Sequence, residues 1–283
     1  MEERLFPVRN YALAETLRSG QAFRWREVAG RWEGVISERW VRLSQNAGGI
    51  LAYAPSPGDW VWLVDYLQIE ADLDGVLSTF PKDEHMQRAI HECPGLRLLK
   101  QEPWETLASF ILSSTKQIVQ IQQIVQLVCE RFGSTIPGSP SKAYTFPTAH
   151  RLAELTEHDL RCCKMGFRAP YLHKTARMID EGAVDLEALR CQSLEEARAE
   201  LMRFPGVGRK IADCVLLFAY HFEKAFPVDV WILKALRMLY FSKRKPTPQR
   251  LLNFTQTYFG PNAGYAQQYL FHYMRTRIGR EKR

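Results

Sequence analysis

The sequence predicts an α+β fold, with an antiparallel sheet in the first third of the chain and only helices after it. Residues 23–54 alternate apolar and polar side chains, are rich in Trp, Val and Ile, and are punctuated by glycines. This pattern is typical of antiparallel strands joined by hairpin turns. From residue 56 the apolar residues recur at helical spacing, and after about residue 98 no convincing strand remains. We therefore expect an N-terminal α/β domain at residues 1–98 and an all-helical region at residues 99–283.

Composition places the chain among globular proteins that act away from the membrane. Hydrophobic residues make up 46% and charged residues 24% of its 283 residues, the usual balance of a globular protein. It has no run of eighteen apolar residues, and its first ten residues lack the apolar segment of a secretory signal, so we expect neither a membrane span nor export. Six cysteines without a CxxC pair favour reduced thiols and a cytoplasmic location, nucleoid-associated if the source is bacterial.

Positive charge is concentrated at the C-terminal end. Residues 234–283 contain eleven Lys or Arg and one acid, a balance of +10, so a total of +7 leaves −3 for the preceding residues. A basic segment on a slightly acidic body suggests that one face binds a polyanion. A solvated basic helix and tail would give the same pattern.

Helices are expected in order along the second part of the chain. Residues 115–133 place Ile and Val on one helical face and end at Gly133. A short helix is expected after Pro147, and another before Gly182. Ser193 and Glu196 form a capping box that predicts the start of the next helix.

The stretch FPGVGRKIADC at residues 204–214 resembles a phosphate-binding loop but fits neither common nucleotide motif. Gly206 and Gly208 are too close for a Walker loop, and Ile211 stands where a dinucleotide loop needs a third glycine. The remaining prediction is a helix–hairpin–helix at residues 193–221. Its second helix would present backbone N–H groups at Gly206, Gly208 and Arg209 to a phosphate without contacting bases. An ordinary corner between two helices is the alternative.

Lys210 follows this hairpin and is either another phosphate contact or a nucleophile. The N-terminus of a helix disfavours positive charge, which favours the neutral amine that can attack. Asp213 could form a surface pair with it. Asp229 lies among apolar residues in FPVDVWI, where a carboxylate is costly unless it is bonded or used. A cap of the helix beginning at Val230 would explain it and is compatible with catalysis.

Five segments carry a resemblance to a known family. The helix–hairpin–helix base-excision DNA glycosylases, and more narrowly the 8-oxoguanine DNA glycosylases, have motifs similar to SGQAFRWR (19–26), GFRAPYL (166–172), LMRFPGVGRKIADCVLLFA (201–219), AFPVDVWILKAL (225–236) and GPNAGYAQQYLF (260–271). Their order and spacing match along nearly the whole chain. The resemblance implies a sheet domain like that of the TATA-binding protein, followed by the helical glycosylase region.

The resemblance also implies a reaction and a base pocket. The residue matching Lys210 attacks C1′ of the deoxyribose, the residue matching Asp229 assists, and the resulting Schiff base permits β-elimination 3′ to the lesion. The damaged base would leave the stack and enter a pocket in which the carbonyl of Gly20 accepts the N7 proton found in 8-oxoguanine and absent from guanine. The other expected pocket residues are Cys214, Pro227, Gln267 and Phe271.

The chain departs from the family where the orphan base should be recognised. The eukaryotic members have an asparagine-rich segment and a second arginine where this chain has other residues, and Trp231 replaces a phosphate-binding histidine. Arg168 is left as the cytosine-recognising residue and Phe167 as the wedge that fills the stack, so we expect a weaker demand for cytosine. The DNA contacts expected here are Thr115, Lys116, Gln117, Gln120, Phe167 and Arg168.

No cofactor is expected. Related glycosylases carry a four-cysteine iron–sulfur loop after this region, but no cysteine follows Cys214. The seven histidines show no ligand-spaced cluster, and we predict no metal site in the side chains. The resemblance does allow a monovalent cation on the backbone of the hairpin at 204–209. The expected partner is double-stranded DNA containing 8-oxoguanine, bound by a monomer.

Two alternatives remain open from the sequence. An alkylbase glycosylase of the same fold typically lacks the lysine, so Lys210 argues against it. A non-catalytic helix–hairpin–helix DNA-binding protein would use Lys210 only to contact phosphate.

Overall fold

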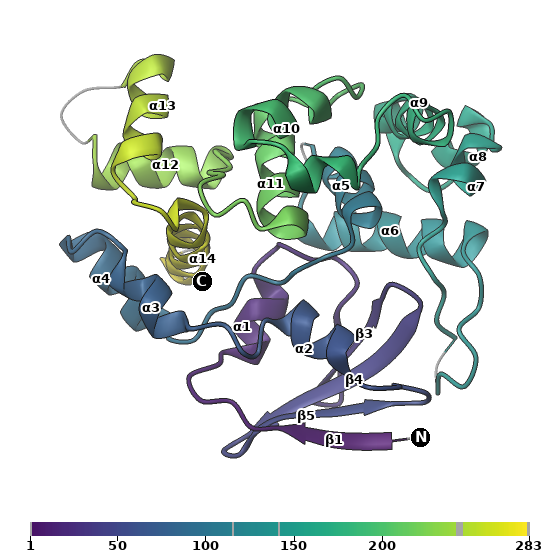
Figure 1. The fold of residues 1–283 in the computed structure, drawn as a ribbon, viewed down its shortest axis with the longest axis horizontal. Coiled ribbons are helices and arrows are strands. Elements are labelled where there is room, and N and C mark those ends of the chain that lie inside the picture. Colours follow the sequence, from purple (N-terminus) through teal and green to yellow (C-terminus); the bar gives the residue numbers. More distant parts are fainter. Residues whose placement is uncertain (1, 115, 141, 242–245, 282–283) are drawn as a thin grey trace.

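The computed structural model describes residues 2–114, 116–140, 142–241 and 246–281. Its N-terminal part is one five-stranded antiparallel sheet in the order β1-β5-β4-β3-β2 (Figure 1). The strands are β1 (Glu2–Phe6), β2 (Arg26–Val28), β3 (Arg31–Ile36), β4 (Arg39–Asn46) and β5 (Gly49–Ala54). The predicted antiparallel sheet is confirmed. The sequence analysis missed β1, because only Phe6 of this edge strand is buried and the strand shows little alternation.

Two short helices cover the inner face of the sheet. Alternation places Val41 and Leu43 of β4 on this face, where both side chains are fully buried. They pack in one cluster with Leu13 and Leu63, which come from α1 (Leu13–Arg18) and α2 (Val61–Leu67). The helix predicted after residue 56 therefore does lie on the sheet.

The rest of the chain is helical, and in the described residues its only β pairing is an isolated bridge between Thr135 and Tyr144. Predicted end signals are present: Gly133 ends α6, and Ser193 and Glu196 form the capping box of α10. Within the described ranges, no helix is both long and apolar enough to cross a membrane. The helices are α3 (Leu73–Ser78), α4 (Glu84–Glu92), α5 (Pro103–Leu112), α6 (Ile118–Phe132), α7 (Ala149–Ala153), α8 (Glu157–Arg161), η1 (Gly166–Arg168), α9 (Ala169–Asp180), η2 (Ala188–Cys191), α10 (Leu194–Leu201), α11 (Arg209–Tyr220), α12 (Val230–Leu239), α13 (Pro248–Thr257) and α14 (Ala263–Glu281).

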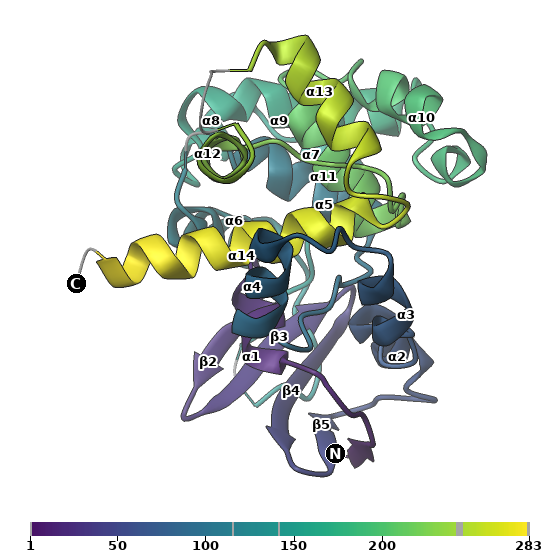
Figure 2. The same cartoon turned by 90° about the vertical axis from the view of Figure 1, so that its left-hand side faces the viewer.

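The C-terminal helix α14 joins the two parts of the molecule. It packs against α4 on one side and α12 on the other, and Figures 1 and 2 both show it between the sheet and the upper helices. The chain's last helix therefore lies beside segments from its first hundred residues. Side chains of α14 can contribute to a site that the N-terminal part also lines.

The buried side-chain amide of Gln21 links the segment between α1 and β2 to the linker that leads into the helices. Its Nε2 donates to the carbonyl of Arg97 (2.8 Å) and its Oε1 accepts from the N–H of Leu99 (2.8 Å). Its own carbonyl accepts from Gln101 Nε2 (2.8 Å). Gln268 of α14 donates to the neighbouring carbonyl of Ser19 (3.1 Å). Residues 19–21 are thus held from the linker and from α14 at once.

Replacing Gln21 with leucine should destabilise the protein strongly. The change leaves the buried N–H of Leu99 and the carbonyl of Arg97 without partners, and we expect it to lower the free energy of unfolding by about 2–4 kcal/mol. Equilibrium denaturation in urea would measure this. The control is Gln87→Leu on the exposed face of α4, which should change the free energy by less than about 0.5 kcal/mol. Equal effects of the two changes would contradict the role given to Gln21.

Candidate active site and nucleic-acid interface

A cleft of about 1080 Å³ lies where the N-terminal segment, α5, α6, α11, α12 and α14 meet. Its walls are largely apolar, with a few polar groups among them, as in sites that enclose an organic ligand. The expected site residues that line it are Gly20, Lys116, Gln117, Gly208, Lys210, Asp229 and Phe271. Segments more than two hundred residues apart in the sequence therefore form one cavity.

Lys210 lies in the first turn of α11, next to the N-cap residue Gly208. Its Nζ donates a hydrogen bond to the Oγ of Ser113 (3.4 Å) and lies 5.2 Å from the centre of the Phe110 ring. Both partners come from α5 and its C-terminal end, against which α11 packs. The amine thus lies in the cleft, on a side chain that is only partly exposed.

Asp213 is not the partner of Lys210. It is buried and forms an ion pair with Arg198 of α10, with 2.6 Å between Asp213 Oδ1 and Arg198 Nε. This pair connects the two helices of the hairpin. The predicted surface pair between Asp213 and Lys210 is therefore wrong, because the Asp213 carboxylate is buried against Arg198 of α10.

Asp229 is the carboxylate that shares the cleft with Lys210. It is the N-cap of α12, where its Oδ1 accepts from the N–H of Ile232 (2.8 Å), so the predicted cap is confirmed. Burial raises the pKa of Asp229, and the backbone N–H of Ile232 and the positive charge of Lys210 oppose that rise. The cap sets the direction of the carboxylate, and burial limits its solvation by water.

Gly20 and Phe271 form opposite parts of the predicted base pocket, and both line the cleft. Gly20 has φ of +80°, and a Cβ there would lie 2.7 Å from Ile118 Cδ1. Glycine is therefore favoured by both backbone conformation and space. A base that entered the cleft could approach the backbone of Gly20 closely.

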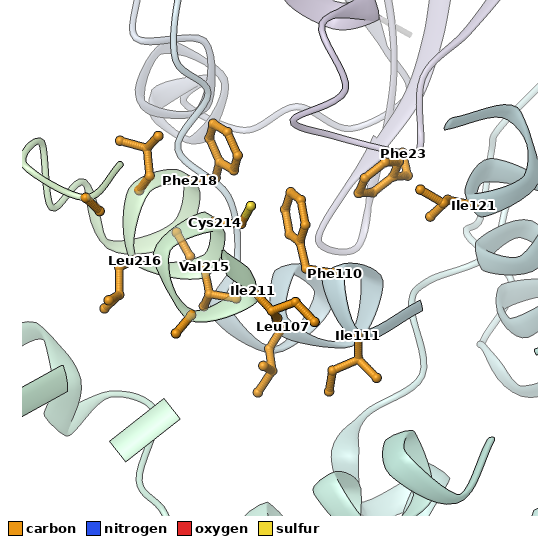
Figure 3. Packing of buried hydrophobic residues seen from close by; sticks show 14 of the residues in the cluster. Phe23, Leu107, Phe110, Ile111, Ile121, Ile211, Cys214, Val215, Leu216 and Phe218 are labelled. Carbon is orange, nitrogen blue, oxygen red and sulfur yellow. The ribbon is translucent and has the colours of Figure 1, made fainter. Parts of the chain in front are cut away.

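The other three predicted pocket residues are buried and do not line the cleft. Cys214 of α11 lies beside the rings of Phe110 and Phe218 (Figure 3), and burial raises the pKa of its thiol to about 11. Pro227 is also buried. Gln267 of α14 is only 4% exposed, and its Oε1 is buried without a hydrogen-bond partner among the described residues. Such an unsatisfied amide oxygen is unusual unless a ligand completes it.

The two residues expected at the orphan base differ in exposure. Phe167 is 55% exposed, as a wedge into a base stack requires. Arg168 is 2% exposed, and its guanidinium lies 4.2 Å from the Phe167 ring centre and donates to the carbonyls of Met165 and Ser114. In this conformation the guanidinium of Arg168 packs on the Phe167 ring and is hydrogen-bonded to backbone carbonyls.

The segment before α6 contributes to the rim of the cleft. Lys116 and Gln117 line it, whereas the Oε1 of Gln120 accepts from the N–H of Gln117 (3.1 Å) and so serves the start of α6. Thr115 lies outside the described residues. Trp231, which replaces the family's histidine, also lines the cleft.

The hairpin between α10 and α11 has the geometry of a backbone anion site. Gly206 has φ of +77°, and a Cβ there would lie 2.6 Å from the Tyr171 ring, so a larger residue would not fit. The first backbone hydrogen bonds of α11 are donated by Ile211 and Ala212 to the carbonyl of Gly208. The N–H groups of Arg209 and Lys210 precede these bonds and are the candidates for binding an anion. Among the described residues, no three His, Cys, Asp or Glu side chains lie close enough to hold a metal ion.

Three residues of the site were missed from the sequence. Phe110 and Ser113 contact the amine of Lys210, and Arg275 of α14 lines the same cleft. Arg275 lies eight residues after Gln267, and helical spacing from Gln267 through Phe271 could have indicated it. No pattern in the sequence pointed to Phe110 or Ser113, because their contact with Lys210 depends on how α5 packs against α11.

Two family models match consecutive parts of the chain. The model of the 8-oxoguanine DNA glycosylase N-terminal domain matches residues 5–107, and that of the HhH-GPD superfamily of base excision DNA repair proteins matches residues 108–261. An N-glycosylase/DNA lyase of Saccharomyces cerevisiae is 31% identical, over 92% of this chain and 82% of the yeast protein. A probable N-glycosylase/DNA lyase of Methanothermobacter thermautotrophicus is 29% identical over 95% of both chains.

Solved structures show the same similarity. The 8-oxoguanine glycosylase/lyase of Clostridium acetobutylicum, in complex with double-stranded DNA containing cytosine opposite 8-oxoguanine, has a TM-score of 0.91 and 32% identity, with 98% of each chain covered. A 3-methyladenine DNA glycosylase of Archaeoglobus fulgidus has a TM-score of 0.77 at 21% identity. The second likeness concerns the fold alone.

Removing the buried ion pair should destabilise the hairpin. Asp213→Ala leaves Arg198 buried without its main partner, so we expect the free energy of unfolding to fall by about 3–5 kcal/mol. The matched control is Glu195→Ala, which removes the exposed partner of the same arginine and should cost less than about 1 kcal/mol. Urea denaturation of the two variants tests the difference. A smaller loss for Asp213→Ala than for Glu195→Ala would contradict it.

Proposed function

Since the chain belongs to the HhH-GPD superfamily of base excision DNA repair proteins and carries the 8-oxoguanine DNA glycosylase N-terminal domain, we propose that Lys210 and Asp229 form its reaction centre. The protein is a bifunctional enzyme that removes 8-oxoguanine from DNA and acts as an AP lyase. The observation that supports the assignment of residues is that a helix-N-terminal lysine and a half-buried carboxylate line one cleft with Gly20 and Phe271.

The two side chains divide the chemistry. The neutral amine of Lys210 attacks C1′, the N9–C1′ bond breaks, and the base departs with that electron pair and a proton. Positive charge develops on the sugar, and the Asp229 carboxylate stabilises it most effectively inside a cleft that excludes water. The C1′–O4′ bond then breaks, O4′ takes up a proton and the sugar ring opens, so that Nζ and C1′ are joined as a Schiff base, which acidifies C2′–H. Loss of that proton breaks the C3′–O bond and cleaves the strand.

The surrounding residues bind the substrate. The carbonyl of Gly20 accepts the N7 proton, Phe271 stacks on the base, and the orphaned Oε1 of Gln267 accepts from its Watson–Crick edge after a small movement. Cys214 and Pro227 support the pocket from behind these residues. The backbone of Gly206, Gly208 and Arg209 holds phosphate, and a monovalent cation on the hairpin would assist it.

The remaining parts of the proposal concern the strand opposite the lesion, the oligomeric state, the location and the domain boundary. Phe167 fills the gap in the stack, and Arg168 reaches the orphan base once its contacts with Met165 and Ser114 open. The DNA backbone beside the orphan base is bound by Lys116, Gln117, Gln120 and Thr115. Because a second arginine is absent at Gln120, cytosine is required less strictly. The protein acts as a monomer in the cytoplasm, with its domains dividing after residue 98.

An alkylbase glycosylase and a non-catalytic DNA-binding protein fit less well. The Archaeoglobus fulgidus 3-methyladenine glycosylase shares the fold with this chain, but a fold does not specify a substrate. A protein that only binds phosphate through Lys210 would have no need to place the amine in a cleft with a half-buried carboxylate. The position of Lys210 between Ser113 and Phe110 therefore favours the nucleophile.

Borohydride reduction during turnover tests the nucleophile. The wild-type protein should become cross-linked to duplex DNA containing 8-oxoguanine, whereas Lys210→Gln should give no cross-link and release base at least about 1000-fold more slowly. The control is Lys224→Gln, which removes the same charge from an exposed residue just beyond α11. It should cross-link like the wild type. A cross-link that persists in Lys210→Gln would exclude this lysine as the nucleophile.

Asp229→Asn tests the carboxylate. The variant should bind the DNA with unchanged affinity and release the base about 10²–10⁴-fold more slowly, because an amide cannot stabilise the positive sugar. The ionised form is the active one, and burial raises the pKa of Asp229, so the wild-type rate should fall on acidification at a higher pH than for an ordinary aspartate. Asp229→Asn should lose the part of this fall that belongs to the carboxylate, so its pH profile should differ in shape from that of the wild type. Single-turnover rates across pH measure both effects, and a pH profile of Asp229→Asn that parallels the wild type would contradict the assignment.

A further inference from the structure

Arg275 occupies a position in the cleft that none of the roles above explains. It lies on α14 one turn beyond Phe271, and its guanidinium carbon is 5.9 Å from the centre of the Phe271 ring. It lines the same cleft as Lys210 and Asp229. A charged group is thus built into the wall against which the base would stack.

The two terminal nitrogens of Arg275 have different surroundings. Nη2 donates to the carbonyl of Arg18 (2.7 Å), which fixes the plane of the guanidinium. Nη1 is buried and has no hydrogen-bond partner among the described residues. It lies 3.5 Å from the point where a Cβ of Gly20 would be. One donor therefore anchors the side chain while the other faces the backbone of Gly20 unsatisfied.

Among the described residues, no acid forms an ion pair with Arg275, and partial burial lowers its pKa without an opposing carboxylate. A buried donor without an acceptor is costly, and so is a half-buried charge without an acid. A ligand that brings an acceptor to Nη1 would remove much of that cost.

The chemistry of the substrate supplies such an acceptor beside Gly20. In 8-oxoguanine the N7–H group is flanked by two carbonyl oxygens, O6 and O8. We propose that Arg275 is a specificity-determining residue whose Nη1 donates a hydrogen bond to one of these two oxygens while the Gly20 carbonyl accepts from N7–H. The pair would recognise a donor and its neighbouring acceptor together, a pattern that guanine, with an unprotonated N7, does not present. This inference rests on the proposed function of the cleft.

Single-turnover excision by Arg275→Met tests the proposal. Methionine keeps much of the apolar stem and removes the donors. We expect release of 8-oxoguanine opposite cytosine to slow by about 10- to 100-fold, the usual effect of losing a hydrogen bond to a charged group. Borohydride trapping on abasic duplex, which has no base to contact, should stay within about threefold of wild type. Arg275→Lys has three donors on a single nitrogen in place of five on three nitrogens, so its rate on 8-oxoguanine should fall between those of the wild type and Arg275→Met.

The controls separate this contact from phosphate binding and from folding. Arg250→Met removes an exposed positive charge from α13 and should alter both substrates alike. If Arg275→Met slows both substrates equally, Arg275 contacts phosphate or supports the fold, and the proposal is overturned. An unchanged rate on 8-oxoguanine overturns it as well, whereas a wild-type protein that neither releases base nor forms a cross-link would overturn the proposed function itself.

Binding measurements identify the oxygen. In a Lys210→Gln background, affinity is compared with and without Arg275→Met for duplexes containing 8-oxoguanine, 8-oxoadenine or a stable abasic analogue. 8-oxoadenine keeps N7–H and O8 but carries an amino group in place of O6. Equal losses on both bases assign the contact to O8, and a loss confined to 8-oxoguanine assigns it to O6. A loss that extends to the abasic analogue contradicts either contact.

Discussion

The buried side-chain amide of Gln21 fixes the position of residues 19–21 relative to the helices that carry the rest of the site. Through Arg97, Leu99 and Gln101 it fixes the 19–21 segment to the linker between the sheet and the helices. Gly20 is the residue between two such anchors, since Gln268 of α14 holds the carbonyl of Ser19. Its backbone can present a carbonyl to a base only if this segment does not move, because hydrogen-bond discrimination depends on distances of a few tenths of an ångström.

Electrostatics in the cleft follow from burial. Asp229 is ionisable in an apolar wall, and its cap of α12 supplies one of the few hydrogen bonds it has. Lys210 rests on Ser113 and the Phe110 ring. The charge of Arg275 forms no ion pair with an acid among the described residues. The protein supplies only part of the hydrogen bonds and opposite charges that each of these groups can accept. An incoming substrate that supplies the rest therefore gains the most binding free energy.

Local signals predicted the fold well and the contacts around the site less well. The capping box at Ser193 and Glu196 and the cap at Asp229 depend on residues three positions apart, so the sequence contains all that determines them. Asp213 was assigned a wrong partner because the choice between Lys210 and Arg198 depends on how α10 packs against α11. Arg168 was assigned from its place in a motif, and only packing against Phe167 and Ser114 shows it folded inward.

The sequence by itself determined the antiparallel sheet, the helix–hairpin–helix, and the likeness that singles out Lys210 and Asp229, because period, caps and motif spacing are properties of neighbouring residues. Only the tertiary structure decided that Gly20, Lys210, Asp229, Phe271 and Arg275 line one cleft. These residues come from four segments, and their meeting depends on α14 packing back against the first hundred residues. Such long-range packing is set by the burial of whole surfaces, and no local pattern encodes which buried donor remains without a partner.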